Sequence, residues 1–130
     1  VRTDERFSVE EVTVLSGTFA KPTATVALRI DRELRKGTAL GIGPVDAIFK
    51  AIAELTETKS ELVRFHVNAI TGGMDALGEV SVAVSEDGRR VIGNGADPDI
   101  IVASARAYVH ALNKLEWHKR QRGAAEPKGI

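Results

Sequence analysis

Apolar and polar positions along the first half of the chain predict three strands followed by one helix. Apolar residues recur at every second position over residues 24–30, which is the period of a strand with one buried face. Over residues 7–14 the alternation changes phase after Val9, so this earlier strand either contains a bulge or is buried on both faces. A third strand is expected around residues 34–40. From Pro44 onward apolar residues return at helical spacing as far as Leu55, and proline suits the first position of a helix.

The second half of the chain repeats this order of elements. Residues 62–70 are rich in β-branched and aromatic side chains, and apolar residues alternate again over 76–84. The Ser-Glu-Asp-Gly segment at 85–88 is typical of a hairpin connection into a strand at 90–92. A longer helix follows, for which Asp97 is the expected N-cap and Pro98 the expected first residue.

The spacing of corresponding features indicates a duplicated βββα unit. Gly41 and Gly93 lie 52 positions apart and Pro44 and Pro98 lie 54 apart, which matches the halves with a two-residue insertion in the second glycine turn. A three-stranded sheet with one helix has a single apolar face, so two such units placed face to face bury both. The predicted fold class is therefore α+β, with two three-stranded antiparallel sheets and two helices.

Length and composition suit one globular domain. The chain has 130 residues, of which 43% are hydrophobic, and its 18 basic and 18 acidic residues cancel, so neither disorder nor a nucleic-acid partner is favoured. It has no cysteine, no apolar run long enough for a membrane span, and no signal-peptide pattern at its start, so we expect a cytoplasmic protein without a membrane contact. We expect one domain over residues 1–122, with repeats at about 6–57 and 61–118, and a flexible tail at 123–130.

Two glycine turns are the candidate binding features that the residues themselves supply. Residues 41–43 and 93–95 are each expected between a strand and a helix, where glycine lets a carboxylate or phosphate approach backbone N–H groups at the positive helix end. Glycines that only turn the chain explain the pattern as well, and neither turn completes a dinucleotide or P-loop motif. Asp46 and Asp99 are expected in the first helical turns, where capping is the default role.

The sequence contains no motif for catalysis or metal binding. His66, His110 and His118 fall in different predicted elements and lack the spacing of a helical metal site. The serines lack a nucleophile turn, and no motif pairs one of them with a histidine and a carboxylate. We therefore expect that this chain is not itself an enzyme and holds no cofactor or metal.

Five segments in the same order carry a resemblance to a known family. They are Ser16-Gly17, Ala-Thr-Val-Ala-Leu at 24–28, Gly-Ile-Gly-Pro-Val-Asp-Ala at 41–47, Asn-Ala-Ile-Thr-Gly-Gly-Met-Asp-Ala-Leu-Gly at 68–78, and Gly-Asn-Gly-Ala-Asp-Pro-Asp-Ile-Ile-Val-Ala-Ser at 93–104. Together they resemble the C-terminal regulatory domain of 2-isopropylmalate synthase. That resemblance implies a parent enzyme that condenses acetyl-CoA with 2-oxoisovalerate in a catalytic barrel containing a divalent metal, and that leucine inhibits through this domain. It also implies a homodimer, with the effector near the dimer interface and the catalytic domain as a further partner.

The same resemblance implies which residues bind the effector. Gly41, Val45 and Asp46 would face its amino-acid backbone, and Asp97 would pair with its ammonium group. The remaining implied residues would wall or complete the side-chain pocket, and they are Leu62, Phe65, Ala69, Ala76, Gly78 and Ala96. Phe65 stands where the family often has an aromatic hydroxyl, so that position supplies no hydroxyl here. Ordinary core packing is an alternative role for Leu62 and Phe65.

Two other functions agree with the same sequence. One is the isoleucine-binding regulatory domain of citramalate synthase, which has the same build; residues 71–78 and 96–101 resemble the leucine enzyme more. The other is a pure dimerisation module whose glycine turns are structural. Amino-acid-binding modules of the βαββαβ type are excluded, because strands arrive here in threes before each helix.

Overall fold

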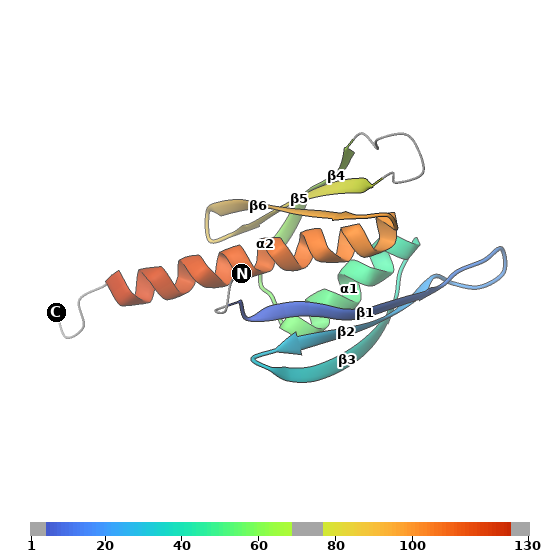
Figure 1. Ribbon diagram of the computed structural model, residues 1–130, viewed down its shortest axis with the longest axis horizontal. Coiled ribbons are helices and arrows are strands. Elements are labelled where there is room, and N and C mark those ends of the chain that lie inside the picture. The colour runs from blue at the N-terminus through green and yellow to red at the C-terminus, as the bar shows by residue number, and fades with distance from the viewer. Residues whose placement is uncertain (1–4, 69–76, 126–130) are drawn as a thin grey trace.

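The computed structural model describes residues 5–68 and 77–125, and the side chains of these residues as far as Gln121. Two three-stranded sheets lie on opposite sides of a pair of helices (Figure 1). The elements in chain order are β1 (Phe7–Leu15), β2 (Thr23–Ile30), β3 (Glu33–Leu40), α1 (Pro44–Thr56), β4 (Glu61–Asn68), β5 (Gly78–Glu86), β6 (Arg89–Asp97) and α2 (Ile100–Ala125). Both sheets are antiparallel, in the orders β1-β2-β3 and β4-β5-β6, so the predicted α+β fold with a duplicated βββα unit is confirmed.

A bulge explains the change of phase in the first strand. In the pairing of β1 with β2, Val9 lies opposite Leu28 and Glu11 lies opposite Ala27, so Glu10 is an extra residue in β1. Inserting one residue restores the apolar side chains on both sides of it to the same face of the sheet. The corresponding bulge in β4 falls between Leu62 and Arg64. Of the two alternatives for this strand, the bulge is correct.

From the turn between their second and third strands to the start of their helices, the two repeats are offset by 56 residues, whereas the glycine turns suggest 52. The β2–β3 turn has positive φ at Asp31 and Arg32, and the β5–β6 turn has it at Asp87 and Gly88, so the two turns correspond. The offset aligns Gly37 with Gly93, so Gly41 and Gly93 are not equivalent. The expected two-residue insertion in the second glycine turn is therefore wrong.

Gly93 and Gly95 lie inside β6 and not in a turn before the helix. A Cβ atom built on Gly93 would lie 2.3 Å from the carbonyl oxygen of Ala107, and one on Gly95 would lie 2.3 Å from that of Ala103. These glycines therefore let α2 lie directly on the strand, with its buried alanine stripe at residues 103, 107 and 111 facing the sheet. The expectation of a second anion-binding glycine turn is wrong, because helix backbone fills the space.

Asp99, and not Asp97, caps α2. Its carboxylate accepts a hydrogen bond of 2.8 Å from the N–H of Ile101, and its carbonyl oxygen accepts one from Ala103. Pro98 therefore precedes the helix. At the other end α2 continues to Ala125, past residue 123 where the sequence suggests a tail, while residues 126–130 lie outside the described chain. No helix in the described part of the chain is long and apolar enough to cross a membrane.

The helices cover the two sheets unequally. Helix α1 packs on β2 and β3, whereas α2 packs on β5 and β6 and also reaches β1 of the other sheet. The symmetry of the repeats would place α1 against β4 in the same way, but within the described residues the two make no backbone-level contact. The side of β4 that faces the molecule's interior is therefore only partly covered.

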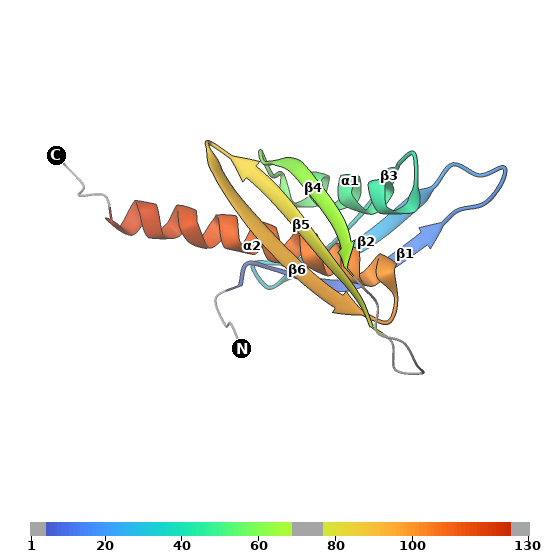
Figure 2. The same ribbon diagram turned by 90° about the horizontal axis from the view of Figure 1, so that it is seen from above.

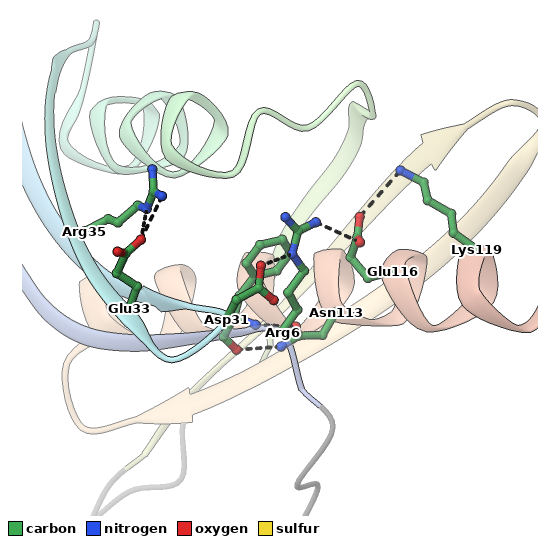
Figure 3. Close-up of polar contacts among 8 residues, drawn as sticks. Arg6, Asp31, Glu33, Arg35, Asn113, Glu116 and Lys119 are labelled. Atoms are coloured by element: carbon green, nitrogen blue, oxygen red, sulfur yellow. Dashed lines mark hydrogen bonds and ion pairs between the residues drawn. The ribbon is translucent and has the colours of Figure 1, made fainter.

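Polar contacts hold the second half of α2 to the first sheet (Figure 3). The buried amide of Asn113 donates to the carbonyl oxygen of Phe7 at 2.8 Å and accepts from its N–H at 2.9 Å, which continues the ladder of β1 onto the helix. The guanidinium of Arg6 binds Glu116 of α2 at 3.0 Å and Asp31 of the β2–β3 turn at 3.2 Å. These bonds fix where β1 begins relative to α2.

Candidate functional site

Both helices begin at the same end of the molecule, which we call the helix-start end (residues 41–46, 65–68, 77–78 and 96–101). Figures 1 and 2 agree that the starts of α1 and α2, the ends of β4 and β6, and the start of β5 come together there. Helix N-termini carry partial positive charge and N–H groups without intrahelical acceptors. The described residues at this end include most of those that the sequence implied for an effector site: Gly41, Val45, Asp46, Phe65, Gly78, Ala96 and Asp97. Ala69 and Ala76, which were also implied, lie outside the described residues.

The aspartate in the first turn of α1 bonds to the turn that precedes the helix. The Asp46 carboxylate accepts a hydrogen bond of 2.9 Å from the N–H of Ile42 and forms an ion pair of 3.0 Å with Lys50. The Ile42 bond first, and then the Lys50 ammonium, lower the pKa of the Asp46 carboxyl. Gly43 is the N-cap and has no side chain to cap the turn. The N–H of Ile42 precedes the N-cap, so Asp46 holds the turn before the helix and the expected capping role of Asp46 is wrong. Its negative charge lies in the first turn of α1.

Gly41 is enclosed by the helix that it precedes. A Cβ atom there would lie 2.4 Å from the backbone nitrogen of Ala47 and 2.8 Å from Oδ2 of Asp46. Its own N–H donates to the carbonyl oxygen of Pro22 at 3.0 Å. Packing of the turn against α1 is thus sufficient to require glycine at this position, whether or not a ligand approaches it.

The second helix start holds Asp97 in local contacts. One oxygen of its carboxylate accepts the N–H of Asp99 at 2.9 Å, and the other lies 3.4 Å from Arg106 of α2. Gly78 lies opposite Asp97 in the β5–β6 pairing, and the side chain of Ile100 occupies the space that a Cβ of Gly78 would need. Gly78 therefore makes room for α2 and does not leave an open pocket wall.

Two other implied residues do not lie on the inner side of the helix-start end. Ala96 is exposed and alternates with Gly95, which faces α2, so Ala96 is on the outer face of the second sheet. Leu62 is the second residue of β4 and lies beyond Phe65, toward the opposite end of the strand. The structure therefore does not bring these two residues to the helix-start end on its inner side.

An aromatic cluster joins β4 to both helices. The ring of Phe65 contacts Phe49 of α1 edge to face, with centroids 5.7 Å apart, and Phe49 contacts Tyr108 of α2 at 4.9 Å. Phe65 nevertheless remains 39% exposed and Val67 40% exposed, although their cross-strand partners on β5 are fully buried. The inner side of β4 is thus an apolar wall that remains half-exposed among the described residues.

Val67 on this wall, and the buried Phe49 and Tyr108 of the adjoining helices, are residues to which the sequence assigned no role in a site. The signals were present, because Phe49 follows Val45 by one helical turn and Val67 follows Phe65 by two strand positions. The apolar pattern of the sequence assigns such residues to the core. Only the structure, in which the inner side of β4 is half-exposed, separates them from ordinary core residues.

The described residues contain no group of three or more acidic, histidine or cysteine side chains that could hold a metal ion. The three histidines lie on different elements, His66 on β4 and the other two on α2. His110 Nδ1 accepts a hydrogen bond from the N–H of Asn94, which holds the His110 ring against the edge of β6. We assign no metal or acid–base chemistry to the helix-start end.

Comparison with known proteins identifies close relatives. A family model described as the LeuA allosteric (dimerisation) domain matches residues 1–116. A 2-isopropylmalate synthase of Syntrophus aciditrophicus (strain SB) is 50% identical over 122 residues, covering 94% of this chain and 24% of the relative. The enzymes of the same name from Gloeobacter violaceus and Thiobacillus denitrificans are 50% and 47% identical, over 87% and 92% of this chain and 21% and 23% of their own lengths. The chain thus spans less than a quarter of the relatives it matches.

Proposed function

The chain belongs to the LeuA allosteric (dimerisation) domain family, and from this premise we propose that it binds leucine as the feedback effector of a 2-isopropylmalate synthase. The family assignment confirms the resemblance found in the sequence. The relatives are about four times longer than the matched segment, which supports a parent enzyme whose catalytic domain lies outside this chain. Condensation of acetyl-CoA with 2-oxoisovalerate and the use of a divalent metal belong to that part of the proposal.

The half-exposed inner side of β4, where Phe65 contacts Phe49 in the second turn of α1, is the observation that carries this proposal. The half-exposed side chains of Phe65 and Val67 offer an apolar surface for a branched aliphatic side chain. The first amides of α1 have no intrahelical acceptor and suit a carboxylate. A small amino acid matches this combination of an anion-binding helix start and an apolar wall.

We also propose that the chain forms a homodimer. Apolar side chains remain exposed on β4. Ile42, just before α1, and Phe19, on the β1–β2 connection, are almost entirely exposed. Exposed apolar surface of this kind marks an interaction site, and a second copy is the partner that the family description supports. An effector bound beside β4 would then lie close to the subunit contact.

Calorimetric titration of the 130-residue chain with leucine, isoleucine and valine tests the proposed ligand. Leucine and isoleucine contain the same number of carbons, so steric fit must distinguish them, and we expect leucine to bind about tenfold more tightly. Binding of isoleucine equal to or tighter than that of leucine would favour the citramalate synthase alternative. Binding of neither amino acid would favour a pure dimerisation module.

A pair of variants locates the site. Phe65→Ala removes the largest side chain of the half-exposed wall, and we expect it to weaken leucine binding at least tenfold. Leu34→Ala is the matched control, because Leu34 is a half-exposed apolar residue on β3, in the other sheet. Equal leucine affinity of the Phe65→Ala variant and the unmodified chain, with both folded by circular dichroism, would remove Phe65 from the site.

A further inference from the structure

A second hollow lies between the edge of β6 and the later turns of α2, which we call the β6–α2 hollow. Its volume is about 410 Å³, within the range of small-molecule sites. Its lining includes Ile92 of β6 and His110, Lys114, Trp117 and His118 of α2. Lys114 follows His110 by four residues, and Trp117 and His118 follow Lys114 by three and four, so these residues form one stripe of the helix. The helix-start end contributes no residue to this lining.

Hydrogen bonds to the edge of β6 hold the side chains of Lys114 and His110 in place. Lys114 Nζ donates to the carbonyl oxygen of Ile92 at 2.6 Å, and His110 Nδ1 accepts the N–H of Asn94 at 2.9 Å. Because Nδ1 of His110 is an acceptor, the neutral ring has its proton on Nε2. This Nε2–H is a donor that the bond to Asn94 does not use. An ammonium group has three N–H donors, and the bond to Ile92 uses one of them. Both side chains are thus oriented before any ligand binds.

Positive charge converges on the hollow from both elements. Burial lowers the pKa of the His118 imidazole, and the positive charges of Arg89 and Lys114 lower it further. Arg120 also lines the hollow, and Glu5 is the acidic residue at its rim. The surroundings therefore favour a negatively charged ligand over a neutral or cationic one.

Apolar surface lies beside these charges. The side chain of Ile92 is 50% exposed and that of Trp117 is 38% exposed. The Trp117 indole meets the His118 ring edge to face, with centroids 5.1 Å apart, which orients the indole. A ligand here would contact donors through one part and apolar side chains through another.

We propose that the β6–α2 hollow binds a small organic anion, a carboxylate that bears an apolar branch. The carboxylate accepts from Lys114 Nζ and from Nε2–H of His110, and the branch packs on Trp117 beside the edge of β6 at Ile92. This inference does not depend on the leucine proposal, because the two sites share no residue.

Trp117 is the single tryptophan of the chain, so its fluorescence reports on this hollow alone. The probes are 2-isopropylmalate, whose synthesis the relatives are named for, malate, which lacks the branch, and inorganic phosphate. We expect a saturable change in Trp117 fluorescence with 2-isopropylmalate at millimolar concentration or below, and about tenfold weaker binding of malate. Failure of 2-isopropylmalate to produce a saturable change, or equal affinity for all three anions, would overturn the proposal.

Variants separate a formed site from general surface charge. Lys114→Gln should weaken 2-isopropylmalate at least tenfold, whereas Lys36→Gln, the same charge change at an exposed position of β3, should leave it unchanged. Ile92→Glu, which places a negative charge at a half-exposed position of the wall, should abolish binding even if Lys114→Gln disturbs the fold. Equal effects of Lys114→Gln and Lys36→Gln would refute the site. If leucine displaces 2-isopropylmalate from the hollow, as read by Trp117 fluorescence, the proposal of a separate site is refuted. The proposal that the chain binds leucine would still hold in that case.

Discussion

Single carboxylates determine how each helix begins. Asp46 reaches back from the first turn of α1 to the N–H of Ile42, and Asp99 performs the capping at α2. Asp97, two residues earlier, bonds to the N–H of Asp99 and so shapes the turn before the helix. The two helix starts thus use different devices, although the repeats that contain them share one fold.

The lowered pKa of Asp46 predicts a contribution to stability that depends on pH. A carboxyl whose pKa is lower in the folded state stabilises the fold above its unfolded pKa of about 3.9, and this stabilisation is lost as pH falls through the folded pKa. Because the carboxylate is partly exposed, we expect only about 0.5 kcal/mol. Urea unfolding between pH 5 and pH 2.5 should therefore show a steeper loss of stability in the unmodified chain than in Asp46→Asn. Parallel curves for the two proteins would contradict this role.

Substitution of Gly41 should destabilise the fold, whether or not a ligand binds near this residue. A methyl group there overlaps the backbone of α1 near Ala47, so Gly41→Ala should lower the free energy of unfolding by about 1–3 kcal/mol. Gly17→Ala is the control, because a Cβ atom at Gly17 meets nothing within 4 Å. Urea denaturation of the two variants measures the difference. A Gly41→Ala protein as stable as the Gly17→Ala protein would show that the turn can shift away from α1.

At the scale of elements, the contact between β6 and α2 depends on residues without large side chains. Glycines at 93 and 95 face alanines at 103, 107 and 111, so a strand and a helix approach each other backbone to backbone. The equivalent contact in the first repeat places Gly37 under the larger Leu55, with a Cβ-to-Cγ distance of 3.0 Å. The second helix therefore lies closer to its sheet than the first.

The Asn113 amide should be a major contributor to the attachment of β1 to α2. Asn113→Leu keeps a similar volume but leaves the N–H and carbonyl of Phe7 without their partners, at a cost of about 1–3 kcal/mol for each buried group. Urea denaturation should show this loss, and hydrogen exchange should show faster exchange of the Phe7 amide. Gln121→Leu, an exposed position on the same helix, is the control and should change stability little. Unaltered exchange at Phe7 in Asn113→Leu would contradict the attachment.

At the scale of the whole molecule, the duplication is not fully symmetric. Helix α2 bridges both sheets, whereas α1 leaves the inner side of β4 partly uncovered. A strand that exposes apolar side chains on its inner side can bind either a ligand or another chain there. This asymmetry is the physical basis for proposing both the effector site and the subunit contact at β4.

The dimer proposal predicts a mass of twice 13.9 kDa at micromolar concentration by light scattering or sedimentation. Phe65→Asp places a charge on the half-exposed wall, and we expect it to shift the equilibrium toward the monomer. Leu34→Asp, a half-exposed position on β3, should remain dimeric. A monomer mass for the unmodified chain, or equal dimer affinity of both folded variants, would count against β4 as the contact.

The order of elements and the fold class were predictable from the sequence alone, whereas for the first strand the sequence left a bulge and burial on both faces as alternatives. Periodicity is a local property, so the alternation in residues 24–30 and the phase change after Val9 determine strands and their faces without knowledge of what covers them. Pro44 and the aspartate at 46 likewise marked the start of α1 correctly. The family resemblance rested on motifs of the same local kind.

Only the tertiary structure decided what the glycines and aspartates do. A glycine inside a strand and a glycine in a turn look alike in sequence, and Gly93 was resolved only by the helix backbone packed on it. Two aspartates around one proline offered two possible caps, and hydrogen-bond geometry selected Asp99. The open side of β4 and the β6–α2 hollow arise between segments far apart in the chain. Long-range packing decides whether such surfaces are covered, because no local pattern records which element lies opposite.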